Sequence, residues 1–249
     1  MRNKIITGLI LLLAIIGIAY FANKKEVIAP NTNVVPVTPA PVVTNSKPIE
    51  FCFARFGQPN TNGYYDKYTL RLALDGEKAT GELNLLPAEK DRKTGDFKGI
   101  VGPVNGEMMA RTANLWWYTS AEGMNTEEEL KIIFGEGTAS IGLGEMVDRG
   151  DGVYIYKDPK KVSFNLYLTD VACTDLDERV NVESYLKENI SKLSPVKAPV
   201  GGTWFVTYIT IDIAKNTGVV TYEDGHREEK RNYTYITEDK GEVKSLTIN

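Results

Sequence analysis

The part of the chain with the most side chains able to do chemistry is residues 111–152. It combines carboxylates with an arginine and two adjacent tryptophans: Arg111, Trp116, Trp117, Glu122, Glu136 and Glu145. Glycosidases use two carboxyl groups, one to protonate the leaving group and one to attack or to activate water. The pattern therefore predicts a candidate binding cleft, with a glycan-acting hydrolase as the catalytic alternative. Successive residues of a strand point to opposite faces, so we expect one tryptophan to lie in the core.

Other catalytic signatures are missing from the sequence. The single histidine, His226, follows an Asp-Gly pair, where side chains are usually solvated. One histidine and two cysteines cannot supply an ordinary zinc site, and there is neither a P-loop nor a GxGxxG motif. We therefore expect no metal and no cofactor, and the catalytic residues, if there are any, stay unknown.

The stretch "VDRGDGVYIYKD" (residues 147–158) has three possible meanings. Its Arg-Gly-Asp tripeptide resembles an adhesion motif, and its acids resemble a cation loop. With Asp148 as position 1, glycine falls at positions 3 and 5, where an EF-hand loop needs ligands, so a calcium loop of that kind is excluded. Asp-Arg-Gly-Asp-Gly is also typical of a hairpin tip, in which glycines take positive φ. We interpret the stretch as a turn.

The two cysteines, Cys52 and Cys173, lie near the ends of a β-rich segment. Disulfides are typical of oxidising compartments, and the pair lacks the CxxC spacing of a redox or metal site. We predict a disulfide that closes a β domain at residues 49–174.

The N-terminus predicts the compartment. Residues 5–22 form an uninterrupted apolar run behind the basic "MRNK". About 18 residues at ~1.5 Å each reach ~27 Å, close to the thickness of the bilayer core. We predict that residues 1–25 are a membrane anchor, with a cleaved signal peptide, and hence a secreted protein, as the alternative. Both place the rest of the chain outside the cytoplasm.

The composition of the chain changes after the apolar run. Residues 26–48 are rich in Pro, Val and Thr and predict an extended linker. The segment 49–174 then repeats short alternating runs separated by turn signals, as in "YTLRLALDGEKATGELNL". Such a pattern without interleaved helices predicts an antiparallel barrel or sandwich.

The C-terminal part has a different pattern. Residues 175–194 place acids early, lysines late and apolar residues at helical spacing, which predicts one helix. Residues 200–249 predict a small β-meander, which at this length is marginal as an independent domain.

Composition limits the partners. The net charge of −4 and the pI near 5.3 argue against nucleic acid, which demands a basic face. We expect a membrane-tethered module that binds an envelope or surface ligand or partner without catalysis. The alternatives are the glycan hydrolase and an envelope-side enzyme inhibitor.

Overall fold

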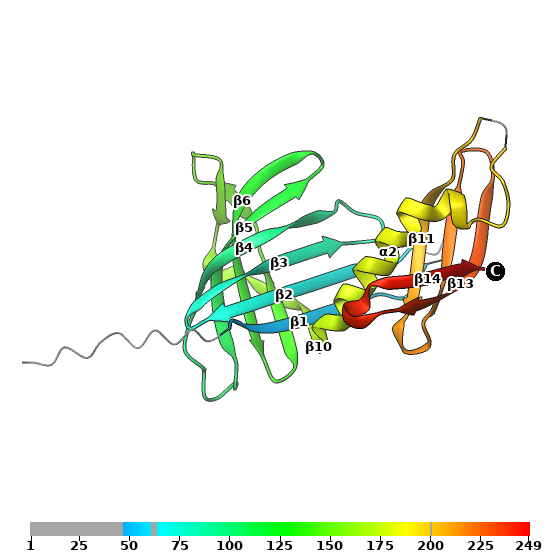
Figure 1. Ribbon diagram of the computed structural model, residues 1–249. Coiled ribbons are helices and arrows are strands. Elements are labelled where there is room, and N and C mark those ends of the chain that lie inside the picture. The colour runs from blue at the N-terminus through cyan, green and yellow to red at the C-terminus, as the bar shows by residue number, and fades with distance from the viewer. Residues whose placement is uncertain (1–46, 61–63, 200) are drawn as a thin grey trace, which may run out of the picture. The chain divides into compact units, whose positions relative to one another are not determined.

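A computed structural model describes residues 47–60, 64–199 and 201–249 (Figure 1). Within these residues the protein is mainly β, with a closed antiparallel barrel of eight strands, one helix and a second small sheet. The sequence left barrel and sandwich open, and the barrel is the form adopted. The predicted anchor at residues 1–25 lies outside the described residues, as does the predicted linker up to residue 46.

The barrel closes because the strands at the two ends of its hydrogen-bonding order, β5 and β6, also pair with each other. The order is β5-β4-β3-β2-β1-β10-β7-β6. The strands are β1 (Ile49–Phe56), β2 (Lys67–Asp75), β3 (Lys78–Leu86), β4 (Lys93–Val101), β5 (Arg111–Ala121), β6 (Met124–Gly135), β7 (Thr138–Leu143) and β10 (Ser163–Val171). The short strands β8 (Met146–Asp148) and β9 (Val153–Tyr156) form a hairpin beside β6, and the turn η1 (Pro159–Lys161) leads into β10.

The inward faces follow the period of two in the sequence. Leu70, Leu72 and Leu74 of β2 are all at most 7% exposed and belong to the barrel core. The β2–β3 hairpin is tight, since Asp75 pairs with Lys78. Only Gly76 of its two turn residues has positive φ (+63°), which fits a type II′ turn.

The predicted disulfide is present and joins the barrel to the helix α2 (Cys173–Leu193). Cys52 of β1 and Cys173 lie 5.2 Å apart at their Cα atoms. Their side chains are on the outer face of β1, where Ala54 and Leu176 pack with them. The outer face of β1 is thus buried at Cys52 and Ala54, by residues that do not belong to the barrel core.

The second sheet is a four-stranded antiparallel meander in the order β11-β12-β13-β14. Its elements are β11 (Phe205–Asp212), η2 (Ile213–Lys215), β12 (Thr217–Glu223), β13 (Glu228–Thr237), η3 (Asp239–Gly241) and β14 (Val243–Ile248). Val182, Leu186 and Ile190 of α2 recur at helical spacing and share a core with Tyr222 and Tyr233 of this sheet. The small sheet therefore buries one face against the helix, which a sheet of this size needs to be stable.

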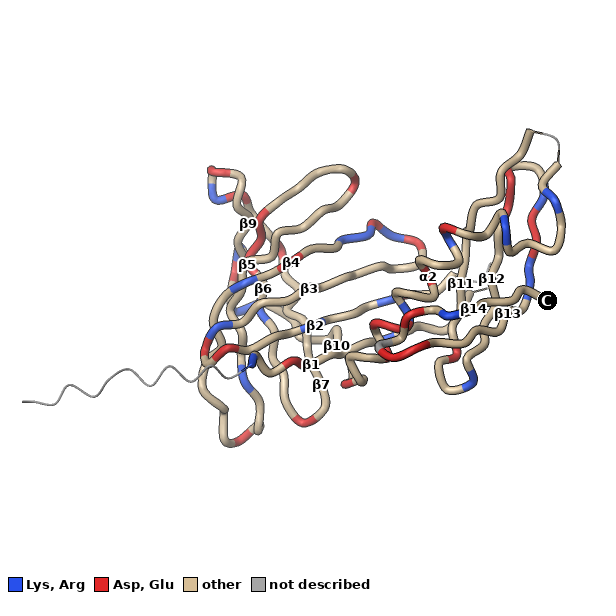
Figure 2. Tube along the Cα trace, viewed as in Figure 1, with Lys and Arg blue, Asp and Glu red and all other residues tan. Residues whose placement is uncertain are grey.

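Acidic and basic residues are interspersed along both sheets (Figure 2). Within the described ranges, no helix combines the length and the apolar character needed to cross a bilayer.

Candidate functional site

One end of the barrel opens into a cavity of ≈ 440 Å³. A volume of this order falls in the ~300–1,000 Å³ range of small-molecule sites, which often occupy the mouths of barrels. Its walls are mainly apolar and aromatic and come from the nine strands β2 to β10. They include Tyr68, Leu85, Trp117, Leu130, Ile141 and Leu166. Below them the barrel is filled by its own core, so the cavity has a closed floor.

The cavity exists because β6 and β7 part at this end. Their ladder runs from Gly135–Thr138 to Ile132–Ile141, and at Glu127 and Glu128 strand β6 pairs with β9 instead. The next pair in the same register would be Lys131 and Gly142. There the hydroxyl of Tyr156 lies between the strands. Its oxygen donates to the Gly142 carbonyl (2.9 Å) and accepts from the Lys131 N–H (3.4 Å).

Gly144 makes room for this tyrosine, because a Cβ there would lie 2.9 Å from the Tyr156 ring. A Cβ on the neighbouring Gly142 would instead lie 2.9 Å from Val162. Tyr156 is only 4% exposed, and this burial raises the pKa of its hydroxyl to about 12. The hydroxyl therefore stays protonated at neutral pH and keeps its donor role between the strands.

A charged pair lies at the open end of the cavity. Lys93 Nζ is 2.8 and 2.9 Å from the two carboxylate oxygens of Glu128 and 5.5 Å from the centre of the Trp117 ring. Thr126 Oγ1 donates to the same carboxylate at 2.9 Å, and Thr126 in turn bonds Thr119. The Trp117 indole N–H donates to the Gly95 carbonyl at 2.9 Å, which fixes the ring. The site is thus a mainly apolar chamber in which the Glu128 carboxylate, the Lys93 ammonium and the Trp117 indole are held together.

Of the aromatic and basic residues that the sequence singled out, only Trp117 lines this cavity. It is 4% exposed and belongs to the core, as we expected for one of the two tryptophans. Trp116 points to the outer face, where the Arg149 guanidinium lies 5.8 Å from its ring centre. Arg111, at the other end of β5, donates from Nε to the Gly102 carbonyl at 2.9 Å.

The three glutamates of the predicted cleft do not meet. Glu122 and Glu136 occupy the turns before and after β6, at φ +49° and +47°. The 12 residues of β6 between these turns span about 40 Å at ~3.4 Å each, which is far more than the ~5–10 Å between a glycosidase pair. Glu145, between β7 and β8, is exposed and pairs with Lys157 at 2.6 Å.

The "DRGDG" stretch is the tip of the β8–β9 hairpin, as interpreted from the sequence. Gly150 and Gly152 have φ of +100° and +81°. Asp148 Oδ1 accepts from both glycine N–H groups, at 2.7 and 3.1 Å, while Arg149 pairs with Asp151 at 2.6 Å. This guanidinium lowers the pKa of Asp151. Among the described residues, no group of three His, Cys, Asp or Glu side chains is arranged to hold a metal ion.

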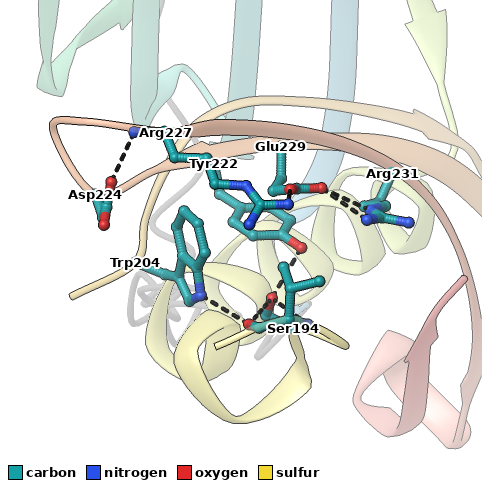
Figure 3. Close-up of polar contacts among 8 residues, drawn as sticks. Ser194, Trp204, Tyr222, Asp224, Arg227, Glu229 and Arg231 are labelled. Carbon is teal, nitrogen blue, oxygen red and sulfur yellow. Dashed lines mark hydrogen bonds and ion pairs between the residues drawn. The ribbon is translucent and has the colours of Figure 1, made fainter. Parts of the chain in front are cut away.

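A second polar cluster lies in the small sheet and has a structural role (Figure 3). The buried carboxylate of Glu229 pairs with Arg227 and, at 2.7 Å, with Arg231, which lowers the pKa of Glu229. Close by, the Tyr222 hydroxyl bonds Ser194 Oγ at 2.9 Å at the end of α2. His226 is exposed in the neighbouring turn, as expected. The Tyr222–Ser194 contact joins β12 to the C-terminal end of α2, and the ion pairs lie at the start of β13.

The sequence reasoning missed Glu128, Lys93 and Tyr156. Glu128 stands in the run "TEEEL", which has the composition of a solvated surface. A signal was present, because Glu128 has the same parity as Leu130, Ile132 and Phe134 and so falls on the inward face of the strand. Lys93 and Tyr156 carry no comparable local signal.

No protein-family model, no curated protein and no solved structure matches the chain. The fold and the site therefore have to carry the functional argument themselves.

Proposed function

We propose that this chain is a membrane-tethered extracytoplasmic module whose barrel binds a small, largely apolar ligand without catalysis. The observation that carries the proposal is the ≈ 440 Å³ cavity, walled by apolar and aromatic side chains and furnished with a single oriented polar pair. Such a chamber with a few fixed polar groups is typical of a binding site. The apolar run at residues 5–22 supports the tether, and the disulfide supports an oxidising compartment.

Neither alternative has a specific observation in its favour. A glycan hydrolase with the predicted acids would need Glu122 and Glu136 in one cleft. An envelope-side enzyme inhibitor would need a loop shaped to enter an active site.

The binding proposal is tested with the full chain in lipid nanodiscs and a neutral probe, 4-phenyl-1-butanol. Calorimetry against empty nanodiscs removes the contribution of the lipid. Leu85 lines the cavity and is half-buried, so Leu85→Trp places extra bulk there. We expect this variant to weaken binding by at least tenfold. The matched control is Ile100→Trp on β4, where the side chain is 63% exposed and does not line the cavity. Equal affinity in both variants would show that the probe binds elsewhere.

The tether is tested separately. Membranes of cells that express the chain are treated with protease from the outer side. We expect cleavage within residues 26–48 and release of a soluble fragment that contains the disulfide. Recovery of intact protein from sealed membranes, with cleavage only after lysis, would place the barrel on the cytoplasmic side and contradict the proposal.

A further inference from the structure

The fixed charge of the cavity is the carboxylate of Glu128. The residue is 9% exposed although it lies at the open end of the barrel, and Thr126 holds the carboxylate by a 2.9 Å hydrogen bond. Its partner is less confined, because the Lys93 side chain is 35% exposed against 12% for that of Glu128. Lys93 is also the first residue of its strand and follows the loop at residues 87–92. The acid is therefore the permanent part of the site and the lysine the displaceable part.

The Lys93 ammonium has the surroundings of a bound cation. It contacts both carboxylate oxygens of Glu128, at 2.8 and 2.9 Å, and lies 5.5 Å from the Trp117 ring centre. A carboxylate next to an aromatic ring is the environment that recognises an ammonium group, through charge-assisted hydrogen bonds and the ring quadrupole. Apolar wall residues such as Leu130, Ile141 and Leu166 would contact the rest of such a ligand.

We propose that the cavity takes a ligand with an apolar body and a primary ammonium head, and that Lys93 occupies the ammonium site until the ligand displaces it. This inference rests on the proposed binding function. On displacement the ligand ammonium replaces the Lys93 ammonium on Glu128, and the lysine moves into solvent. The buried acid stays paired throughout, so the exchange leaves no uncompensated charge behind.

Charge complementarity decides between ligand classes. A carboxylate ligand would bring a second negative charge beside Glu128, and like charges in a buried site are costly. A neutral ligand would leave Lys93 in place and would have only the apolar walls to bind. Three other charged side chains line the cavity. Lys90 and Asp91 have opposite signs, and Glu129 is paired with Lys131 at 3.6 Å, so together they favour neither class.

The test compares three probes that share one body: 4-phenylbutylamine, 4-phenyl-1-butanol and 4-phenylbutanoate. Each is titrated into the full chain in nanodiscs at pH 7.5, with empty nanodiscs as the blank. The variants are Glu128→Gln, which keeps the shape and removes the charge, and Lys93→Met, which keeps the length and removes the internal cation. A third variant carries Glu128→Gln and Lys93→Met together. It lacks both charges of the ion pair and therefore serves as a folded reference if Lys93→Met alone is unstable.

We expect the wild-type chain to bind the amine more tightly than the alcohol and the carboxylate least. Lys93→Met should raise the affinity for the amine by at least tenfold and change that for the alcohol by less than threefold, because only the amine competes with Lys93. In Glu128→Gln and in the double variant the amine and the alcohol should bind within threefold of each other.

Two outcomes overturn the inference and leave the binding function standing. One is equal affinity for amine and alcohol in the wild type, in Lys93→Met and in Glu128→Gln. The other is a preference for the carboxylate that is lost in Lys93→Met, which would make Lys93 the recognition group. Failure of all three probes to bind would overturn the proposed function as well.

Discussion

The hydroxyl of Tyr156 offers a sharp test of how the barrel is held open at its mouth. It bonds the Gly142 carbonyl of β7 at 2.9 Å and the Lys131 N–H of β6 at 3.4 Å, in place of a direct ladder bond between these residues. Tyr156→Phe keeps the ring and removes the hydroxyl. The ring is 4% exposed, so water reaches the two backbone groups poorly. A buried group left without its partner costs ~1–3 kcal/mol, and the long bond to Lys131 contributes little, so we expect a loss of about 2 kcal/mol.

The same hydroxyl predicts a dependence on alkaline pH. Burial raises the folded-state pKa of Tyr156 from 10.0 to about 12, because the phenolate is poorly solvated there. A raised pKa means that the unfolded chain loses its proton first. The stability contributed by the protonated hydroxyl is therefore fully present below pH 10 and is lost as the pH rises towards 12. Tyr156→Phe has no such proton, so the difference in the free energy of unfolding between wild type and variant should narrow over this interval.

The assay is urea unfolding followed by tryptophan fluorescence, at pH 7.5 and at several values between 9.5 and 11.5. The control is Tyr154→Phe, two residues earlier on β9 at a half-buried position. We expect it to shift the free energy of unfolding by less than ~0.5 kcal/mol, as for changes away from special features. If Tyr156→Phe is as stable as Tyr154→Phe at neutral pH, the hydroxyl does not join the two strands. If this difference in the free energy of unfolding stays constant from pH 9.5 to 11.5, the pKa of Tyr156 is not raised by folding.

The remaining predictions concern the disulfide and the hairpin tip. Replacing Cys52 and Cys173 by Ala should lower the free energy of unfolding by about 5 kcal/mol, the chain-entropy value for a sequence separation of 121, measured by urea unfolding; a change below ~1 kcal/mol would contradict it. Gly150→Val should lower the melting temperature because φ is +100° there, whereas an unchanged melting temperature would mean that the tip adopts another conformation. Asp148→Ala should lower the free energy of unfolding by about 1 kcal/mol, since Oδ1 accepts from two backbone N–H groups, and Asp148→Asn should lower it by less than half as much. Calcium should leave the melting temperatures of the wild type and of both variants unchanged. A calcium-dependent rise in the wild type alone would indicate a metal site.

Much of the barrel could be predicted because its signals are local. The alternation of Leu70, Leu72 and Leu74 marks an inward face before any partner strand is known, since the period of a strand is two. The Asp-Gly pair at Asp75 and Gly76 marks the turn that joins this strand to the next. The cysteine pair could also be assigned, because the chain has two cysteines and each therefore has one possible partner within the chain.

The candidate site depended on contacts that no local pattern contains. Lys93 and Glu128 are 35 residues apart in the sequence and meet only because the barrel brings the starts of β4 and β6 to the same end. The grouping of Glu122 with Glu136 had to fail for the same reason, since residues close in sequence lie at opposite ends of a long strand.

The sequence by itself determined the strands, their inward faces, the helix and the cysteine pair, since each follows from the chemistry of neighbouring residues. Only the tertiary structure decided between barrel and sandwich, because closure requires β1 and β10, the first and last strands of the barrel in the sequence, to pair with each other. It also decided where the barrel stays open. That depends on Tyr156, from a strand outside the barrel, which takes the hydrogen bonds that β6 and β7 would otherwise share. The cavity lies where the β6–β7 ladder stops, and the point at which a ladder stops depends on how the whole sheet assembles.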